Sequence, residues 1–205
     1  MRDREIVLAT RSAGKLRELR PIFSGSGFTV KDLGEAGLPP SSEEDELESA
    51  DTFEENAAAK ARFFHARLGL PVVADDSGLE VIALGGRPGV RSKRWSERPD
   101  LHGLALDAAN NARLIDELKE KRDRRARYVC VACYLDDRGE LIRRGEVEGT
   151  IVAEPRGTGG FGYDPYFLSS ELGVTFGEAA IEAKERVSHR GRAFRALLSA
   201  LGERG

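Results

Sequence analysis

Residues 70–79 read Leu-Pro-Val-Val-Ala-Asp-Asp-Ser-Gly-Leu, so a short apolar run leads directly into two adjacent acids. Apolar runs of this length are typical of buried strands, and Asp, Ser and Gly favour turns. We therefore predict a strand that ends at Ala74 and a turn that presents Asp75 and Asp76 at the edge of a sheet. Oxygen ligands at such an edge suit Mg²⁺ and phosphate chemistry. The alternative is that the two acids only begin the turn.

The sequence on both sides of this stretch alternates between strand-like and helical patterns. We predict further strands over residues 6–9, 28–31, 128–135, 140–148 and 150–153, and helices over 14–23, 52–68, 101–121 and 190–201. Residues 136–139 have the composition of a hairpin turn. Helices that alternate with strands, together with one hairpin, indicate an α/β fold with a mixed central β-sheet flanked by helices. No linker or repeat interrupts the chain, so we predict one domain over residues 1–205.

Composition limits the functional classes. Of the 205 residues, 40% are hydrophobic and 33% are charged, and no apolar run approaches the about 20 residues that span a bilayer. The first apolar segment is shorter than the core of a signal peptide, so we expect a cytoplasmic protein without membrane contact. The formal net charge of −3 argues against a protein whose main role is to bind nucleic acid, because such binding depends on a basic excess.

Cys130 and Cys133 form a Cys-x-x-Cys pattern inside a predicted strand. Residues three apart in a strand point to opposite faces of the sheet. A redox pair or a zinc site needs converging thiols or a second ligand pair. We therefore interpret both cysteines as core residues.

Residues 10–15 read Thr-Arg-Ser-Ala-Gly-Lys and lie between a predicted strand and a predicted helix. The free N–H groups of a helix start, a hydroxyl and a lysine can together bind a polyphosphate. The glycine spacing of a Walker A loop is missing. The alternative is an ordinary helix cap with a surface lysine.

The helix predicted over residues 52–68 carries a polar stripe. Thr52, Asn56 and Lys60 recur every four residues and so line one face. Thr52 with Glu55 has the spacing of a capping box, which favours a helix start here. Lys60 becomes a candidate site residue if this stripe faces the two acids, and Glu48 could then add a second carboxylate. Otherwise both are solvated surface charges.

Two segments near the C-terminus carry candidate recognition residues. Residues 157–162 match Gly-x-Gly-x-x-Gly, but Tyr-Asp-Pro follows, and a proline disfavours the helix that a dinucleotide fingerprint requires. We interpret this segment as a loop that presents Phe161 for stacking and Asp164 for hydrogen bonding, or else as a core phenylalanine beside a turn. Further along, Lys184, His189 and Arg190 carry donors that suit an anion or the carbonyl edge of a purine.

The order and spacing of these motifs, with Leu-Gly-Gly-Arg-Pro-Gly-Val at residues 84–90 and Ser-His-Arg-Gly at 188–191, resemble the inosine triphosphate pyrophosphatase family. The resemblance spans nearly the whole chain. One departure is Ser12, where the family usually has Asn. The resemblance implies a two-lobed α/β fold with a substrate cleft between the lobes. It also implies an enzyme that hydrolyses ITP, dITP and XTP to the monophosphate and pyrophosphate, which removes these non-standard purines from the nucleotide pool.

The resemblance also implies roles for individual residues. Asp76 and Lys60 are the expected catalytic residues, and Glu48 and Asp76 are the expected ligands of Mg²⁺. Ser77 is expected to add a hydrogen bond to the substrate, and Phe161 to stack on its base. The full set of expected substrate-binding residues is Thr10, Arg11, Ser12, Ala13, Gly14, Lys15, Ser77, Phe161, Gly162, Tyr163, Asp164, Lys184, His189 and Arg190.

A homodimer is the oligomeric state that the resemblance implies. Two other functions stay open. A related pyrophosphatase with another base preference would share the acidic motif, and a nucleotide-binding regulator without turnover would be consistent with Ser12. Contact with nucleic acid is the least supported alternative.

Overall fold

The computed structural model describes residues 4–204. Within that range the strands are β1 (Arg4–Leu8), β2 (Phe28–Asp32), β3 (Val72–Val81), β4 (Arg125–Asp136), β5 (Gly139–Ile151) and β6 (Phe167–Ser169). The α-helices are α1 (Ala13–Phe23), α2 (Phe53–Leu68), α3 (Gly103–Glu117), α4 (Ile181–Val187) and α5 (His189–Glu203). Short 3-10 helices are η1 (Ser42–Glu46), η2 (Ile82–Leu84) and η3 (Gly89–Arg94).

The strands form one sheet in the order β2-β1-β3-β4-β5-β6. β1 pairs in parallel with β2 and β3, whereas β5 pairs antiparallel with β6. The predicted α/β class with a mixed sheet and flanking helices is therefore confirmed. The substrate cleft stays a prediction.

The described chain divides into two compact units. The first takes residues 4–76, 130–145 and 190–204, and the second takes Ser77–Val129 and Glu146–His189. Strands β3, β4 and β5 each contribute residues to both units.

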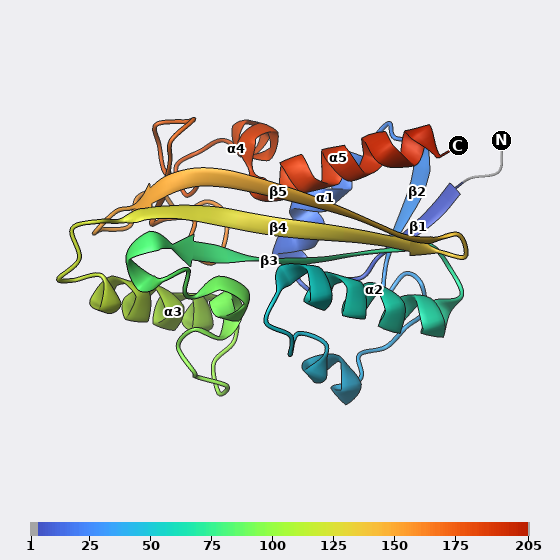
Figure 1. Cartoon of the computed structure of the whole chain (residues 1–205), viewed down its shortest axis with the longest axis horizontal. Coiled ribbons are helices and arrows are strands. Elements are labelled where there is room, and N and C mark those ends of the chain that lie inside the picture. The colour runs from blue at the N-terminus through green and yellow to red at the C-terminus, as the bar shows by residue number, and fades with distance from the viewer. Residues whose placement is uncertain (1–3, 205) are drawn as a thin grey trace. The chain divides into compact units, whose positions relative to one another are not determined.

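Helices cover both faces of the sheet in the first unit, with α1 and α5 on one side of the strands and α2 on the other (Figure 1). The core on the α1 and α5 side takes alternate strand residues, because successive side chains of a strand point to opposite faces. It comprises Ile6 and Leu8 of β1, Val73 of β3, Cys130, Ala132 and Tyr134 of β4, and six buried apolar residues of α1 and α5, among them Phe23 and Phe194.

The core of the second unit is built around aromatic rings. Tyr128 contacts Phe167 at 4.7 Å between ring centroids and lies parallel to Phe176 at 6.0 Å. Leu114 and Leu118 from α3 and the following turn are fully buried in the same cluster. This unit presents the glycine-rich segment discussed below.

One prediction from the acidic motif is wrong. The strand does not end at Ala74, because β3 continues through Asp75, Asp76, Ser77 and Gly78 to Val81. Its neighbour β1 ends at Leu8, which pairs with Val73. Asp75 and Asp76 therefore lie in the strand itself, just beyond the carboxyl end of β1.

Other element boundaries differ from the predictions in smaller ways. The strands predicted at 140–148 and 150–153 are one strand, β5, since residue 149 is a glycine that the ladder tolerates. The short elements β6 and α4 were not predicted, because β6 has three residues and α4 has seven, too few for a clear period. The helix predicted over 101–121 is shorter, Gly103–Glu117.

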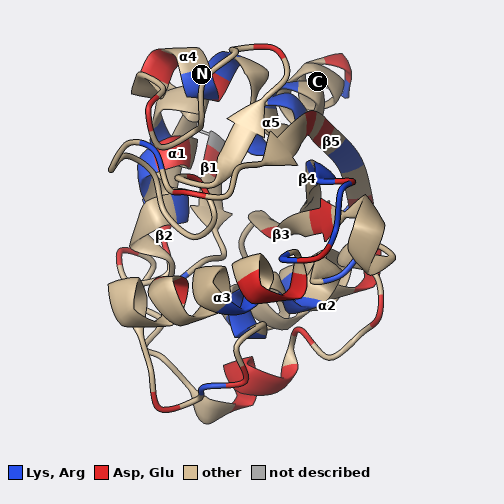
Figure 2. Cartoon of the chain, turned by 90° about the vertical axis from the view of Figure 1, so that its left-hand side faces the viewer, with Lys and Arg blue, Asp and Glu red and all other residues tan. Residues whose placement is uncertain are grey.

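Charged residues are interspersed along the chain, with acidic and basic segments alternating over the helices and loops (Figure 2). Many of them pair locally, as Arg20 does with Asp32 and Glu35. Among the described residues, no helix is both long and apolar enough to cross a bilayer.

Candidate functional site

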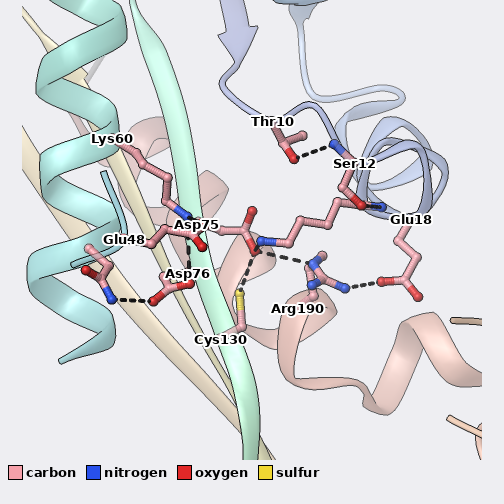
Figure 3. A network of polar contacts seen from close by, with 11 residues as sticks. Thr10, Ser12, Glu18, Glu48, Lys60, Asp75, Asp76, Cys130 and Arg190 are labelled. Atoms are coloured by element: carbon pink, nitrogen blue, oxygen red, sulfur yellow. Dashed lines mark hydrogen bonds and ion pairs between the residues drawn. The ribbon is translucent and has the colours of Figure 1, made fainter. Parts of the chain in front are cut away.

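The two acids of β3 point to opposite faces of the sheet because they are adjacent in a strand. Asp75 lies on the side of α1 and α5, and Asp76 lies on the side of α2 (Figure 3). Both side chains are buried, with exposed fractions of 2% and 4%. The two adjacent acids therefore contact two different groups of polar residues, one on each face of the sheet.

Asp75 is held by two cations. Its Oδ2 atom lies 2.9 Å from the Lys15 ammonium and 3.6 Å from Nε of Arg190. The Sγ atom of Cys130 contacts the same oxygen at 3.8 Å. Burial alone raises the pKa of Asp75, but the charges of Lys15, Arg190 and Lys60 outweigh it and lower that pKa well below its usual value. Asp75 is therefore ionised, and Lys15 and Arg190 are fixed around it.

Arg190 also pairs with Glu18 of α1. The Arg190 guanidinium thus faces carboxylates at both ends within the first unit. Burial by itself would lower the pKa of Arg190, but the charges of Glu18 and Asp75 outweigh that effect and raise the pKa. The structure thus places Arg190 beside Asp75 and Glu18 within the first unit.

Asp76 lies against α2. Its Oδ2 atom accepts a hydrogen bond of 2.9 Å from the Asn56 amide, and its Oδ1 atom lies 3.7 Å from the Lys60 ammonium. Burial raises the pKa of Asp76, the Lys60 charge opposes this rise, and the Glu48 charge reinforces it. A carboxylate with a raised pKa is suited to accept a proton near neutral pH.

Lys60 joins three acceptors. Its ammonium donates to Oε1 of Glu48 at 2.8 Å and to the carbonyl oxygen of Asp75, and it faces Asp76. Burial lowers its pKa, but the charges of Glu48, Asp76 and Asp75 outweigh that effect and the pKa is raised. The predicted stripe on this helix therefore faces the Asp76 carboxylate and the backbone carbonyl of Asp75, and Lys60 brings Glu48 into the same group.

The sequence of α2 explains how its polar stripe is aimed. Thr52 caps the helix by accepting a hydrogen bond from the backbone N–H of Glu55 at 3.2 Å, as the capping-box spacing predicts. The Glu55 carboxylate accepts from the Thr52 hydroxyl at 2.7 Å. Ala57, Ala61 and Phe64 are buried, so Asn56 and Lys60 follow the edge of the apolar face. Their side chains can therefore reach β3.

The loop between β1 and α1 provides a helix start beside Asp75. Ser12 is the N-cap, and its hydroxyl accepts from the backbone N–H of Lys15 at 3.3 Å. The N–H of Ser12 donates to the Thr10 hydroxyl at 3.2 Å. Ala13 and Gly14 form the first turn, whose N–H groups have no intrahelical partner. Such a turn next to a lysine can bind an anion.

Glu48 and Asp76 supply hard oxygen donors on the α2 side, and both carboxylates face the Lys60 ammonium. Within residues 4–204 no group of three His, Cys, Asp or Glu side chains converges on one point. Mg²⁺ is commonly bound by one or two carboxylates, with substrate phosphates and water completing its octahedron. The donor set therefore fits Mg²⁺ that is bound together with a polyphosphate.

The glycine-rich segment of the second unit is a loop without a following helix, as predicted. Its backbone packs closely on Gly177, since the N–H of Gly159 donates to the Gly177 carbonyl at 2.9 Å. The loop is also tied to α3. Asp107 accepts from the N–H of Gly162 at 2.8 Å, and the Asn111 amide donates to the Gly162 carbonyl at 2.9 Å.

Asp164 and Lys184 form a buried pair beside Phe161. The Lys184 ammonium lies 2.6 Å from Oδ2 of Asp164 and 5.4 Å from the centre of the Phe161 ring. The same carboxylate oxygen accepts from the Phe161 N–H at 2.8 Å. These three predicted residues are thus brought together. Asp164 fixes both the loop and the lysine, a role that its sequence position did not indicate.

His189 lies flat against Tyr128, with 4.6 Å between the ring centroids and 7° between the planes. Tyr163 is buried and its hydroxyl donates to the Ser92 carbonyl at 2.7 Å. Ser77 is half-buried within β3. Tyr163 therefore anchors the loop, and Tyr128 sets the plane of His189.

Several site residues were not predicted. They are Glu18, Asn111, Asp107 and Tyr128, which hold predicted residues in place. Asp107 and Asn111 are four residues apart on a predicted helix, so their common face was visible in the sequence. The partners of Arg190 and His189 are distant in sequence, and no local pattern marks them.

A glycine-to-alanine substitution tests the loop packing. Gly157 has φ +74°, and a Cβ atom built on it would lie 2.1 Å from the Gly177 carbonyl oxygen. Gly173 has a similar φ of +69° with open space around its Cβ position. We expect Gly173→Ala to lower the free energy of unfolding by about 1 kcal/mol through backbone strain. Gly157→Ala should cost about 1–3 kcal/mol more, because the backbone must also move. Urea denaturation measures both, and equal losses would contradict the packing argument.

The Ham1 family model matches residues 6–200 of this sequence. This chain belongs to the Ham1 family. A protein of Burkholderia pseudomallei named dITP/XTP pyrophosphatase is 48% identical over 201 residues, which cover 97% of this chain and 93% of that protein. A Thermus thermophilus protein of the same name is 44% identical over 204 residues, with 98% and 93% covered.

The Ham1-family fold is also found in solved structures. A HAM1 protein from Coxiella burnetii has a TM-score of 0.83 and 35% identity to this chain, over 97% of this chain and 98% of that one. The Ham1 protein of Staphylococcus aureus has a TM-score of 0.81 and 34% identity, over 98% and 100%. The family predicted from the ordered motifs is confirmed.

Proposed function

We propose that this protein is a nucleoside triphosphate pyrophosphatase that hydrolyses ITP, dITP and XTP to the corresponding monophosphate and pyrophosphate. The activity removes non-standard purines from the nucleotide pool. The similar Burkholderia and Thermus proteins are named for dITP and XTP, which supports this substrate class.

The observation that carries the proposal is the arrangement around the two acids of β3. Asp76, Lys60 and Glu48 form a charged group on one face, while Lys15 and the α1 start lie beside Asp75 on the other. A polyphosphate needs several cations and N–H donors, and its hydrolysis needs a base. Both requirements are met by groups that surround the Asp75-Asp76 dipeptide.

Asp76 is proposed to orient and deprotonate the attacking water, because its carboxylate is held in place by the Asn56 amide and lies beside the Lys60 ammonium. The water oxygen bonds to the α phosphorus while its proton passes to the Asp76 carboxylate, and the bond from the α phosphorus to the bridging oxygen breaks, so that pyrophosphate leaves with that oxygen. Lys60, Lys15 and the N–H groups of Ala13 and Gly14 bind the phosphate oxygens and neutralise the charge that grows there.

Glu48 and Asp76 would hold Mg²⁺. When bound, the ion supplies positive charge to the phosphates. Because Lys60 already faces both carboxylates, its ammonium is placed to share the phosphates with the metal.

Base recognition is proposed for the second unit. Phe161 offers a ring for stacking, and Lys184 and His189 offer donors for a 6-oxo group. Adenine carries a 6-amino group, which is a donor rather than an acceptor and would therefore oppose these donors. A site of this kind can reject the mismatched base by about 10⁴-fold. Exclusion of guanine must depend on its 2-amino group.

The proposal includes a homodimer in the cytoplasm, as the motif resemblance implies. Sedimentation of the purified protein tests the dimer.

The deciding experiment measures pyrophosphate release from ITP, XTP, GTP and ATP, with and without Mg²⁺. We expect rapid release from ITP and XTP only, and none without the metal. Release from a methylated guanine or modified pyrimidine nucleotide in place of ITP would move the assignment to another base preference. Tight ITP binding without turnover would favour the nucleotide-binding regulator.

A further inference from the structure

We propose that Arg11 is a positioning residue, which fixes the loop that carries Glu48, rather than a ligand of the substrate phosphates. The inference rests on the proposed function for the role of Glu48. Arg11 follows Thr10 in the β1–α1 loop and precedes Lys15 of α1 by four residues, so a phosphate contact was the natural expectation. Its contacts point elsewhere.

All three nitrogen atoms of the Arg11 guanidinium are bonded within the first unit. Nε and Nη2 donate to the two carboxylate oxygens of Glu44 at 3.1 and 2.8 Å. Nη1 donates to the Leu38 carbonyl at 2.9 Å, and Nη2 also donates to the Pro39 carbonyl at 3.0 Å. A bidentate arginine–carboxylate pair is geometrically specific. The four bonds use most of the five N–H groups that arginine has.

Glu44 is itself fixed. Its Oε1 atom accepts from the N–H of Ser41 at 3.2 Å, which closes a capping box at the start of η1. The hydrogen bond from Arg11 is the main cause that lowers the pKa of Glu44, so the carboxylate is ionised. Arg11 thus attaches the start of η1 and the two residues Leu38 and Pro39 to the β1–α1 loop.

Glu48 lies between this attachment and a second one. Asn56 accepts from the N–H of Ala50 at 2.9 Å and donates to the Ala50 carbonyl at 3.3 Å. Glu48 follows Glu44 by four residues and precedes Ala50 by two. Its carboxylate reaches Lys60 at 2.8 Å. The two attachments therefore set where Glu48 lies relative to Asp76.

This arrangement couples two parts of the phosphate site. The β1–α1 loop leads into the first turn of α1, which carries the N–H groups and Lys15, and the attached loop carries Glu48. Arg11 holds them in one geometry. Outer residues that orient metal ligands typically affect metal affinity or activity by roughly 10- to 100-fold when they are lost.

The test compares Arg11→Ala with Glu44→Gln and with the double variant. Glu44 makes the attachment from the other side. If Arg11 acts by positioning, each single variant should raise by roughly tenfold both the Mg²⁺ concentration for half-maximal rate and the Mg²⁺ dissociation constant, measured by calorimetry with a non-hydrolysable ITP analogue bound. The double variant should be no worse than either single one. The KM for ITP at saturating Mg²⁺ should change less than about twofold, and the preference for ITP over ATP should stay the same.

Two further variants sharpen the test. Arg11→Lys keeps the charge but cannot make the bidentate pair, so it should behave like Arg11→Ala. Arg20, in the last turn of α1, makes a comparable pair with Asp32 and Glu35, and none of these three is a site residue. Arg20→Ala is the matched control and should leave the Mg²⁺ dependence unchanged.

Three outcomes would overturn the inference. They are normal Mg²⁺ dependence in Glu44→Gln, additive losses in the double variant, and recovery of the ITP KM by Arg11→Lys after a loss in Arg11→Ala. The last result would make Arg11 a phosphate ligand. Each can occur in an enzyme that still releases pyrophosphate from ITP, whereas absence of release in the unaltered protein would reject the proposed function itself.

Discussion

Asp76→Asn should lower the rate of pyrophosphate release from ITP by about 10³-fold, because an amide cannot accept the proton of the attacking water. The free energy of unfolding of Asp76→Asn should not fall below that of the unaltered protein. Burial raises the pKa of Asp76, so the ionised side chain disfavours the folded state at neutral pH. The neutral amide removes that cost, and Lys60 keeps Glu48 and the Asp75 carbonyl as partners.

The measurement is single-turnover pyrophosphate release beside urea denaturation at pH 7. Asp137→Asn is the matched control, since Asp137 is an acid on the surface with a side chain 99% exposed, and it should keep normal activity. A rate within about threefold of the unaltered protein for Asp76→Asn would remove Asp76 from the proposed role of base.

Asp75→Asn, in contrast to Asp76→Asn, should have its largest effect on the free energy of unfolding. The carboxylate is 2% exposed and neutralises Lys15 and Arg190. Its removal leaves buried positive charge without compensation, and loss of one partner of a buried pair typically costs about 3–5 kcal/mol. We expect a loss of that size in the free energy of unfolding at pH 7.

The stabilising contribution of the Asp75 carboxylate should depend on pH. The folded pKa of Asp75 is lowered below the unfolded value of about 3.9. Its contribution is therefore fully present above about pH 4 and is lost as the pH falls toward the folded pKa. The difference between Asp75→Asn and the unaltered protein should narrow below about pH 4. A loss under about 1 kcal/mol at pH 7, or a difference that widens in acid, would show that Asp75 does not hold this cluster.

The contrast between these neighbours shows what sequence patterns could predict. The apolar run before Asp75, the Thr52 cap and the four-residue spacing of Asn56 and Lys60 are local signals, and the structure confirms the strand, the helix and the aim of its polar stripe. The end of the strand could not be predicted, because Asp, Ser and Gly favour turns locally while the neighbouring strands keep β3 extended through them.

The partners of Asp75 could not be predicted from the sequence either. Lys15 is 60 residues away in the chain and Arg190 is 115 residues away, and no period links them to a carboxylate. The same holds for Arg11 and Glu44, 33 residues apart, whose pairing changes the role that the position of Arg11 suggests.

The sequence by itself determined the α/β class, most helices, the residue types of the site and, through its ordered motifs, the family. These depend on local spacing and on chemistry that each residue carries with it. The tertiary structure alone decided that Asp75 and Asp76 serve opposite faces of β3, that Arg190 and Lys15 neutralise the first, and that Arg11 holds the Glu48 loop. The reason is physical: burial and charge pairing depend on which distant segments the sheet brings together, and a pattern along the chain does not contain that information.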